Sequence, residues 1–343
     1  TYTIQSYNIE NILGGVVTTD SYVYPLAASN LQISYMTQSN AFLSWTTAQG
    51  AAYYKLQSSQ YAQLTIYDPI HPNNINWPGF GEAIIFSPDG NTMFISDAIN
   101  QYIYIYTYVA GSWVQTSTIY PPSFINDSST FGISMAISPD GNTLYVGAPG
   151  RNNNTSNGTV LIYTKLGGTW TNSGQIDSTV TGAYRASFGV SIAISLDGNK
   201  LYIGSLYGNN YGCVVIFTYS GGIWTQTDII NCPASIQLSE YQYFGFCIAL
   251  SNDGNTLYIG SPGGGGTSNG YGSIQIFTLS NGVWTNTSSI QCPSQLLYIE
   301  NGNTYSTEFG IYFTLSPDNN TLVCCLAIIS YGINFANYAA VLR

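Results

Sequence analysis

Five copies of a Phe-Gly dipeptide constrain the fold of this chain more than any other feature. They stand at residues 80–81, 131–132, 188–189, 244–245 and 309–310, with spacings of 51, 57, 56 and 65 residues. Eight residues after each Phe comes the second position of a predicted tight turn, at Pro88, Pro139, Leu196, Asn252 and Pro317. Asp follows every time, and then Gly or, in the last copy, Asn. Pro sets φ for a type I turn, Asp caps the turn, and Gly or Asn takes its left-handed position. Each copy therefore predicts a β-hairpin that is encoded locally.

Each copy extends beyond the hairpin into a longer unit. After the turn at 138–142, for example, come an apolar strand, a polar loop, a third strand at 159–164 and a Gly-Gly turn before Trp170. Trp113, Trp224 and Trp284 stand at the same place in other copies. The pattern predicts four-stranded antiparallel units, because short β-forming segments alternate with turn signals. These predicted blades span residues 80–119, 131–176, 188–230 and 244–290.

The two ends of the chain complement each other in this scheme. The last copy, 309–343, lacks a fourth strand, whereas residues 1–9 form an orphan strand with alternating Tyr2, Ile4 and Tyr7. Residues 30–68 look like a degenerate blade. We therefore predict an all-β fold, a single β-propeller over 1–343 with six blades, or seven as the alternative, whose closing blade is shared by the N- and C-terminal strands. The same complementation between chains would be strand donation, which propagates into a filament.

Composition limits what the protein can bind. Only 6% of residues are charged, and 16 acids against six bases give a net charge of −10. A nucleic-acid partner is excluded, since these few bases cannot form a basic face. No apolar run has the roughly 20 residues of a membrane helix. The chain starts at Thr1 rather than Met, so we expect that an N-terminal segment has been removed, and the low charge favours an extracellular location.

The repeat resembles the FG-GAP-type β-propeller repeats of integrin α-chain heads and of microbial and viral surface proteins. The resemblance rests on the Phe-Gly opening, the SPDGNTLY turn and strand, Gly147-Ala148-Pro149 and Gly-x-Trp-Thr, and it covers residues 80 to 343. It implies the propeller fold. Calcium-binding members carry an Asp-rich loop, but the corresponding loops here, 150–157, 206–212 and 263–272, contain no Asp or Glu. We therefore expect no metal and no other cofactor.

Few residues suggest catalysis. The only histidine, His71, lies in the 69–78 linker, and a loop role is favoured over a catalytic triad. Five of the acids are the turn aspartates, and the others, which include Glu82, Asp97, Asp177, Asp228, Glu240, Glu300 and Glu308, show no paired spacing. The Gly263–266 run lacks the Lys of a phosphate loop. Cys213, Cys247, Cys324 and Cys325 are expected as buried thiols, while Cys232 and Cys292 are left open between a thiol and a disulfide.

The candidate binding face is the one that carries the loops between second and third strands and the connections between blades. Tyr and Asn side chains there suit sugars or protein partners: Arg151, Asn152, Tyr207, Asn209, Asn210, Tyr211, Tyr241, Tyr243 and Tyr271. Glycosylation sequons stand at Asn126, Asn153, Asn154, Asn157, Asn286 and Asn319.

These observations predict a non-enzymatic extracellular protein, structural or adhesive, such as a glycoprotein subunit of a cell surface, surface filament or virion surface. A carbohydrate-binding, lectin-like propeller is the alternative, followed by a glycan-active enzyme. The expected partners are other proteins, further copies of the chain, or glycans.

Overall fold

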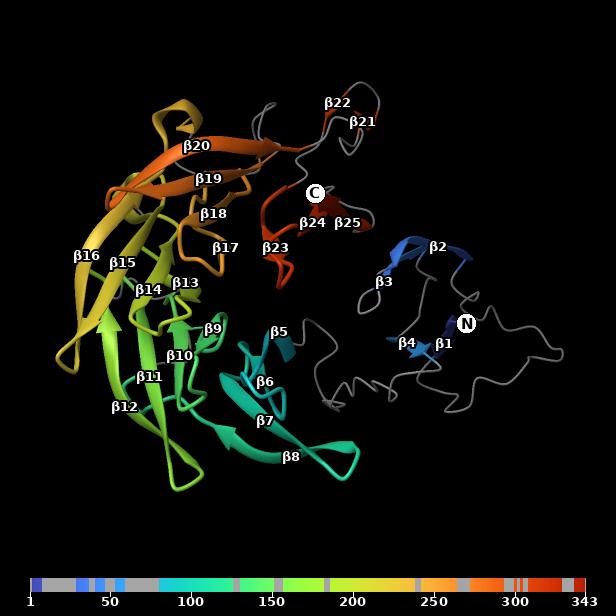
Figure 1. Ribbon diagram of the computed structural model, residues 1–343, viewed down its shortest axis with the longest axis horizontal. Helices are drawn as coiled ribbons and strands as arrows, with labels where there is room; N and C mark the ends of the chain where they lie inside the picture. Colours follow the sequence, from blue (N-terminus) through green and yellow to red (C-terminus); the bar gives the residue numbers. More distant parts are fainter. Residues whose placement is uncertain are drawn as a thin grey trace, which may run out of the picture. The chain divides into compact units, whose positions relative to one another are not determined.

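The computed structural model divides the chain into two compact units, Thr1–Pro72 and Asn73–Arg343 (Figure 1). The residues that it describes are 2–7, 29–36, 41–46, 53–58, 80–125, 130–150, 157–181, 186–237, 242–263, 272–292, 299–300, 303–304, 308–328 and 336–342.

The larger unit is built from successive antiparallel sheets that match the predicted repeat. The first two sheets are β5 (Phe80–Phe86), β6 (Thr92–Asp97), β7 (Tyr102–Val109), β8 (Ser112–Ile119), and β9 (Met135–Ile137), β10 (Thr143–Ala148), β11 (Thr159–Leu166), β12 (Thr169–Asp177). The next two are β13 (Phe188–Ile194), β14 (Lys200–Ser205), β15 (Cys213–Ser220), β16 (Ile223–Asn231), and β17 (Ile248–Leu250), β18 (Thr256–Ser261), β19 (Ser273–Ser280), β20 (Val283–Gln291). Each pairs its strands in chain order, so the predicted β-propeller of four-stranded blades is confirmed.

The last sheet of this unit has three strands: β23 (Tyr312–Leu315), β24 (Leu322–Ile328) and β25 (Ala336–Leu342). A short pair, β21 (Ile299–Glu300) and β22 (Asn303–Thr304), precedes it. Two 3₁₀ turns, η1 (Gly208–Asn210) and η2 (Ala234–Ile236), are the only helical segments among the described residues.

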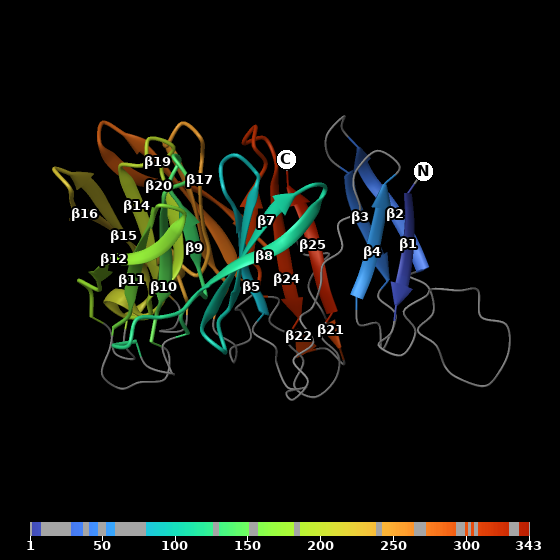
Figure 2. The same ribbon diagram turned by 90° about the horizontal axis from the view of Figure 1, so that it is seen from below.

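The sheets follow one another as blades, with their first strands innermost (Figure 1). β5 contacts β9, β9 contacts β13, β13 contacts β17, and β17 contacts β23. The strands stand side by side when the unit is viewed at right angles to Figure 1 (Figure 2). Because each sheet is a meander, the first and third connections of every blade lie at one end, which we call the turn face. The second connection and the link to the next blade lie at the other end, the loop face.

Close contact between backbones joins three of the blades to the blade that follows, whereas at the first joint Gly132 faces the side chain of Ser96. A Cβ atom on Gly147 of β10 would overlap the carbonyl oxygen of Gly189, in the Phe-Gly of the following blade, and Gly204 stands in the same way against Gly245. Gly189 has a φ of +94°, which side chains other than hydrogen rarely allow. The Phe of the motif has no exposed surface at 131, 188, 244 and 309, while Phe80 of the first copy is partly buried. The Phe-Gly motif therefore serves the joint between blades.

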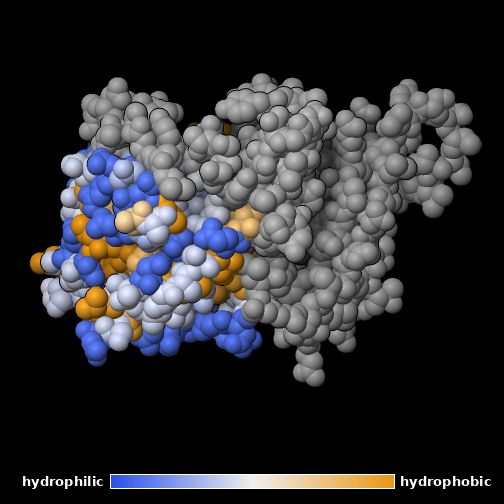
Figure 3. Space-filling view, turned by 90° about the horizontal axis from the view of Figure 1, so that it is seen from above, coloured by the Kyte–Doolittle hydropathy of each residue, from blue (hydrophilic) through white to orange (hydrophobic). Residues whose placement is uncertain are grey.

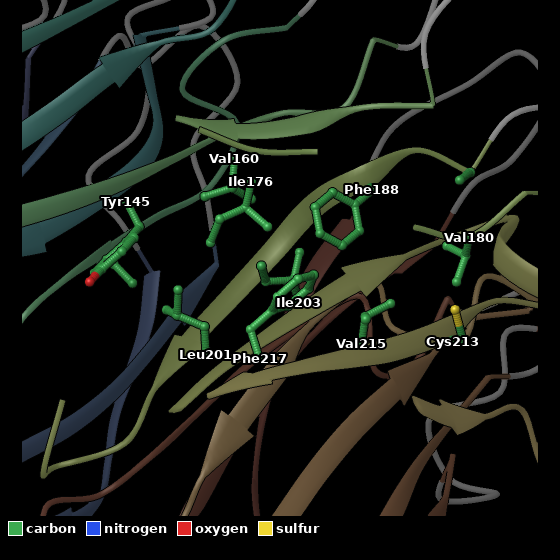
Figure 4. Close-up of a cluster of buried hydrophobic side chains, with 12 residues drawn as sticks. Tyr145, Val160, Ile176, Val180, Phe188, Leu201, Ile203, Cys213, Val215 and Phe217 are labelled. Atoms are coloured by element: carbon green, nitrogen blue, oxygen red, sulfur yellow. The ribbon is translucent and has the colours of Figure 1, made fainter. Parts of the chain in front are cut away.

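Side chains fill the space between neighbouring sheets. Figure 4 shows the core between β9–β12 and β13–β16, to which Tyr145 and Val160 contribute from one sheet and Phe188, Leu201 and Ile203 from the other. Three of the four predicted outer-strand tryptophans lie across joints between blades, while Trp113 contacts Phe86 and Tyr108 of its own blade. The three meet an aromatic ring of the preceding blade edge-on, in the pairs Phe94–Trp170, Tyr145–Trp224 and Tyr202–Trp284. Such pairs stabilise a fold beyond the area that they bury.

The turn aspartates have a structural role, as predicted. In the turn before β10, Oδ1 of Asp140 accepts a 2.5 Å bond from the Ser138 hydroxyl and a 3.0 Å bond from the backbone N–H of Asn142. The same arrangement recurs around Asp89, Asp197, Asp253 and Asp318. These bonds lower the pKa of all five carboxyl groups. In the last turn Asn319 takes the glycine position at a φ of 58°.

The smaller unit corrects one prediction. It contains β1 (Tyr2–Tyr7), β2 (Ser29–Met36), β3 (Ala41–Thr46) and β4 (Tyr53–Ser58). β1 pairs with β4, with Tyr2 opposite Ser58, instead of completing the sheet of 309–343. A partner nearby in the sequence costs less closure entropy than one at the far end of the chain. β2, β3 and β4 fall where the degenerate blade at 30–68 was predicted, but among the described strands β2 pairs with β3 and β4 pairs with β1. The end of the predicted blade, from residue 59 to residue 68, lies outside the described residues, and a single domain over 1–343 stays a prediction.

We predict that Gly147→Ala destabilises the protein by about 1–3 kcal/mol or more, because the new methyl group must displace the backbone of the next blade. Gly174→Ala is the matched control, since Gly174 is also a strand glycine and its Cβ would have only Ile162 at 4.0 Å. Urea unfolding of both variants measures the difference. Equal stability of the two variants would contradict the proposed joint.

We also predict that stability falls in acid. The folded pKa of each turn Asp is below its unfolded value of about 3.9, so the stabilisation is complete above that pH and is lost as pH falls through the lowered pKa. The melting temperature should therefore decrease steeply below about pH 4, and Asp140→Asn with Asp197→Asn should flatten the decrease. Asp228→Asn, an exposed change outside the turns, is the control. Identical pH curves for wild type and the double variant would refute this role.

Candidate functional site

On the loop face, residues at one position of the repeat share an unusual backbone conformation, which the sequence analysis did not predict. In the four later copies, the residue directly before Phe-Gly has a left-handed backbone: Thr130, Ser187, Tyr243 and Glu308, with φ of 53°, 47°, 53° and 43°. A tight turn follows, in which the carbonyl oxygen of Thr130, for example, accepts a bond from the N–H of Ile133 at 3.2 Å. We call these four the rim residues, because each stands at the loop-face end of an innermost strand.

The rim residues combine unusual backbone geometry with reactive side chains. A non-glycine residue in this conformation costs about 1–3 kcal/mol, and such residues cluster at functional sites. For Thr130, which is β-branched, the conformation is a true outlier. Three hydroxyl groups and one carboxyl group thus occupy equivalent positions in four adjacent blades. Thr130, Tyr243 and Glu308 are partly exposed, whereas Ser187 is buried.

Glu308 is the acidic member of the rim. Its side chain is half-buried, and burial raises the pKa of its carboxyl group. A carboxyl with a raised pKa can exchange protons nearer to neutral pH than an exposed one, which is the property of a general acid or base. The sequence marks Glu308 only as an acid without a paired partner. Its position before Phe309-Gly310 is the signal that could have identified it.

Two predicted binding residues join this rim. The rings of Tyr207 and Tyr243 pack edge to face, with centroids 5.6 Å apart. The backbone N–H of Tyr207 donates to the carbonyl of Ala186, next to the rim residue Ser187, at 3.2 Å. The loop between β14 and β15 is therefore held against the rim, and the site can offer aromatic faces as well as hydroxyl groups.

The other predicted loop residues are placed as follows. Asn209 and Asn210 are exposed at positive φ, and Nδ2 of Asn209 donates to Oδ1 of Asn231 at 2.6 Å. Tyr211 is half-buried against the core between β13–β16 and β17–β20. Arg151, Asn152, Tyr241 and Tyr271 lie outside the described residues, as do His71 and the sequons at Asn126, Asn153 and Asn154. Of the other sequons, Asn157 and Asn319 are half-buried and Asn286 is exposed, with Nδ2 of Asn286 bonded to Gln275 at 3.2 Å.

Other candidates for chemistry are engaged in the fold. Asp97 is only 1% exposed, and its two oxygens accept bonds from the backbone N–H and Nδ2 of Asn100. Asp177 accepts both of its side-chain bonds from Gln175. Cys213 and Cys232 are free thiols whose pKa burial raises to about 12, so they are inert at neutral pH. Among the described residues, no three of His, Cys, Asp and Glu lie together as metal ligands would.

Comparison with known proteins adds information about the fold. No family model matches the chain. No curated protein matches it either. A chain of Kuenenia stuttgartiensis hydrazine synthase is similar in structure, with a TM-score of 0.52 and 16% identity over 81% of this chain and 66% of that one. The chain thus spans slightly less than two thirds of that protein, and at this identity the likeness concerns the fold alone.

Two further similar structures are described as lactonases. The periplasmic gluconolactonase of Pseudomonas aeruginosa has a TM-score of 0.49 and 16% identity over 74% of this chain and 71% of that one. A Bacteroides uniformis protein assigned as a 6-phosphogluconolactonase has a TM-score of 0.47 and 13% identity over 76% and 70%.

These comparisons correct the predicted function. The sequence led to a non-enzymatic surface protein, but the similar structures include proteins described as enzymes. Spacing along the sequence cannot detect residues that come from different blades. In a propeller, equivalent positions of successive blades lie on the same face, as the rim residues do. As for membranes, no helix among the described residues has the length and apolar character needed to cross one.

Proposed function

We propose that the chain is a hydrolytic enzyme whose active site is the rim on the loop face, with Glu308 as the general acid and base. The observation that carries this proposal is the half-buried Glu308 carboxyl, held in a left-handed backbone at the position that hydroxyl-bearing residues occupy in the preceding blades. The Glu308 carboxylate accepts a proton from water while the water oxygen adds to a carbonyl carbon. It then returns that proton to the departing alkoxide oxygen.

The negative net charge of the molecule favours an uncharged substrate over an anionic one. The net charge is −10, and the described lysines of the larger unit, Lys165 and Lys200, lie near the turn face. An anionic substrate would meet repulsion. Tyr207, Tyr243 and Thr130, which are partly exposed, favour a polar, hydroxylated molecule, which can stack on rings and form hydrogen bonds. An uncharged ester or lactone of a sugar acid fits this description.

We further infer that the repeats are of the FG-GAP type and that the protein acts outside the cytoplasm. The contact between Gly147 of the Gly-Ala-Pro segment and Gly189 of the next Phe-Gly supports the first inference. The low content of charged residues and the exposed sequon at Asn286 support the second.

We predict that Glu308→Gln lowers kcat/KM for a sugar lactone at least about 100-fold, the usual contribution of a general acid or base. Glu82→Gln is the matched control, because Glu82 is an exposed acid on an innermost strand. Gluconolactone and a neutral aryl ester serve as substrates, followed by proton release and by absorbance. The proposal fails if wild type hydrolyses neither above background, or if Glu308→Gln retains the wild-type rate.

We expect the rate to rise with pH through the pKa of Glu308, because only the ionised carboxylate can accept the proton from water. Burial raises this pKa, so the rise should lie above the ordinary glutamate value of 4.5. A pH profile of kcat/KM between about pH 4 and pH 8 records it. A profile that is flat across this range, or that falls with rising pH, would contradict the assigned role.

A further inference from the structure

A groove on the turn face, far from the rim at the other end of the strands, has the composition of a ligand site. It lies between the sheets β9–β12 and β13–β16 and has a volume of about 570 Å³. Three aromatic side chains line it, Tyr145, Tyr219 and Trp224, together with the carboxyl groups of Asp140 and Asp197. We call it the Trp224 groove.

Its aromatic residues form one connected surface. The ring centroids of Tyr145 and Trp224 are 5.7 Å apart at 87°, and those of Tyr219 and Trp224 are 5.1 Å apart at 44°. Tyr145 anchors this surface, because it belongs to the buried cluster between the two sheets (Figure 4). Tyr219 is 43% exposed and Trp224 is half-buried. The ring faces carry the partial negative charge that attracts cations.

The charges of the groove also favour a cation. The described residues that line it include two carboxylates and no Lys or Arg. Within each turn the Ser and backbone N–H bonds engage Oδ1 of the Asp and hold the carboxylate in place. Lys200 lies close enough to influence the pKa of Asp197 but does not line the groove. The lining therefore carries a net negative charge beside aromatic faces.

The equivalent groove at the preceding joint between blades contains an ammonium group of the protein itself. The groove between β5–β8 and β9–β12, of about 490 Å³, has Asp89 and Asp140 at the turns and Trp170 in place of Trp224. There the protein supplies its own cation, because Nζ of Lys165 lies 5.9 Å from the centroid of the Trp170 ring. Lys165 stands opposite Trp170 in the strand register, as Tyr219 stands opposite Trp224. In the Trp224 groove, tyrosine thus replaces the internal ammonium group.

We propose that the Trp224 groove binds an organic ammonium cation, of the quaternary or alkylammonium class. The cation takes the place that the Lys165 ammonium group has at the preceding joint. Its alkyl groups contact the rings of Tyr219 and Trp224, and Asp140 and Asp197 balance its charge. Hydrophobic and hydrophilic residues are interspersed over the described surface in Figure 3. The groove, in which aromatic rings stand beside carboxylates, has the same mixed character.

Choline and its uncharged carbon isostere, 3,3-dimethylbutan-1-ol, test the proposal directly. Titration calorimetry and tryptophan fluorescence should show saturable binding of choline and at least about tenfold weaker binding of the isostere, a difference of the size that cation–π contacts produce. Equal affinity for the two compounds would contradict the proposal, because the groove would then recognise apolar groups and not the positive charge. Absence of saturable choline binding would overturn the proposal outright.

A reciprocal pair of variants locates the site. Tyr219→Lys places an internal ammonium group in the Trp224 groove and should abolish choline binding. Lys165→Tyr removes the internal cation from the preceding groove and should create a second choline site, which doubles the stoichiometry. Both positions are exposed, so the melting temperature should stay unchanged. The proposal is wrong if Tyr219→Lys binds choline as wild type does, or if Tyr219→Ala binds it more tightly.

Discussion

The close approach of two glycine backbones, which recurs at three successive joints between blades, is the contact on which the rest of the structure depends. Gly147, Gly204 and Gly260 on the second strands admit the Phe-Gly turn of the next blade, whose carbonyl oxygen occupies the space of a missing side chain. The buried Phe then fills the core beside it, and the Trp of the outer strand closes the joint against an aromatic ring of the preceding blade. These positions require glycine, because a side chain there would overlap the backbone of the next blade and a close-packed interior has no room for it.

Local chemistry explains why the sequence predicted so much of the larger unit. The Ser-x-Asp-Gly-Asn turns are determined by hydrogen bonds within six residues, so each hairpin can be read without its neighbours. Because the distance from Phe-Gly to the turn is the same in every copy, the strands of one copy predict the positions of the strands in the others. The closing strand was mispredicted because pairing partners depend on competition among distant segments. β1 pairs with β4, and no local sequence pattern predicts that pairing.

The candidate site was harder to predict than the fold for a related reason. Propeller topology relates residues that are separated by a whole repeat, and Thr130, Ser187, Tyr243 and Glu308 share a place before Phe-Gly but no common residue type. Their shared feature, a left-handed backbone before Phe-Gly, is visible only in three dimensions. Tyr207 and Tyr243 were named from loop composition and do lie together. The raised pKa of Glu308 results from burial, which no count of acids could reveal.

The central claim is that the rim presents a carboxyl group prepared for proton transfer. Carbon-13 NMR of side-chain carboxyl groups, recorded across the acid range and assigned by the loss of one resonance in Glu308→Gln, measures it most directly. The account predicts that the Glu308 resonance titrates at a pKa above the usual value for glutamate, while the turn aspartates titrate below theirs. A Glu308 pKa at or below the usual value would contradict the account, because an exposed, fully ionised carboxylate would have no special capacity to exchange protons at the rim.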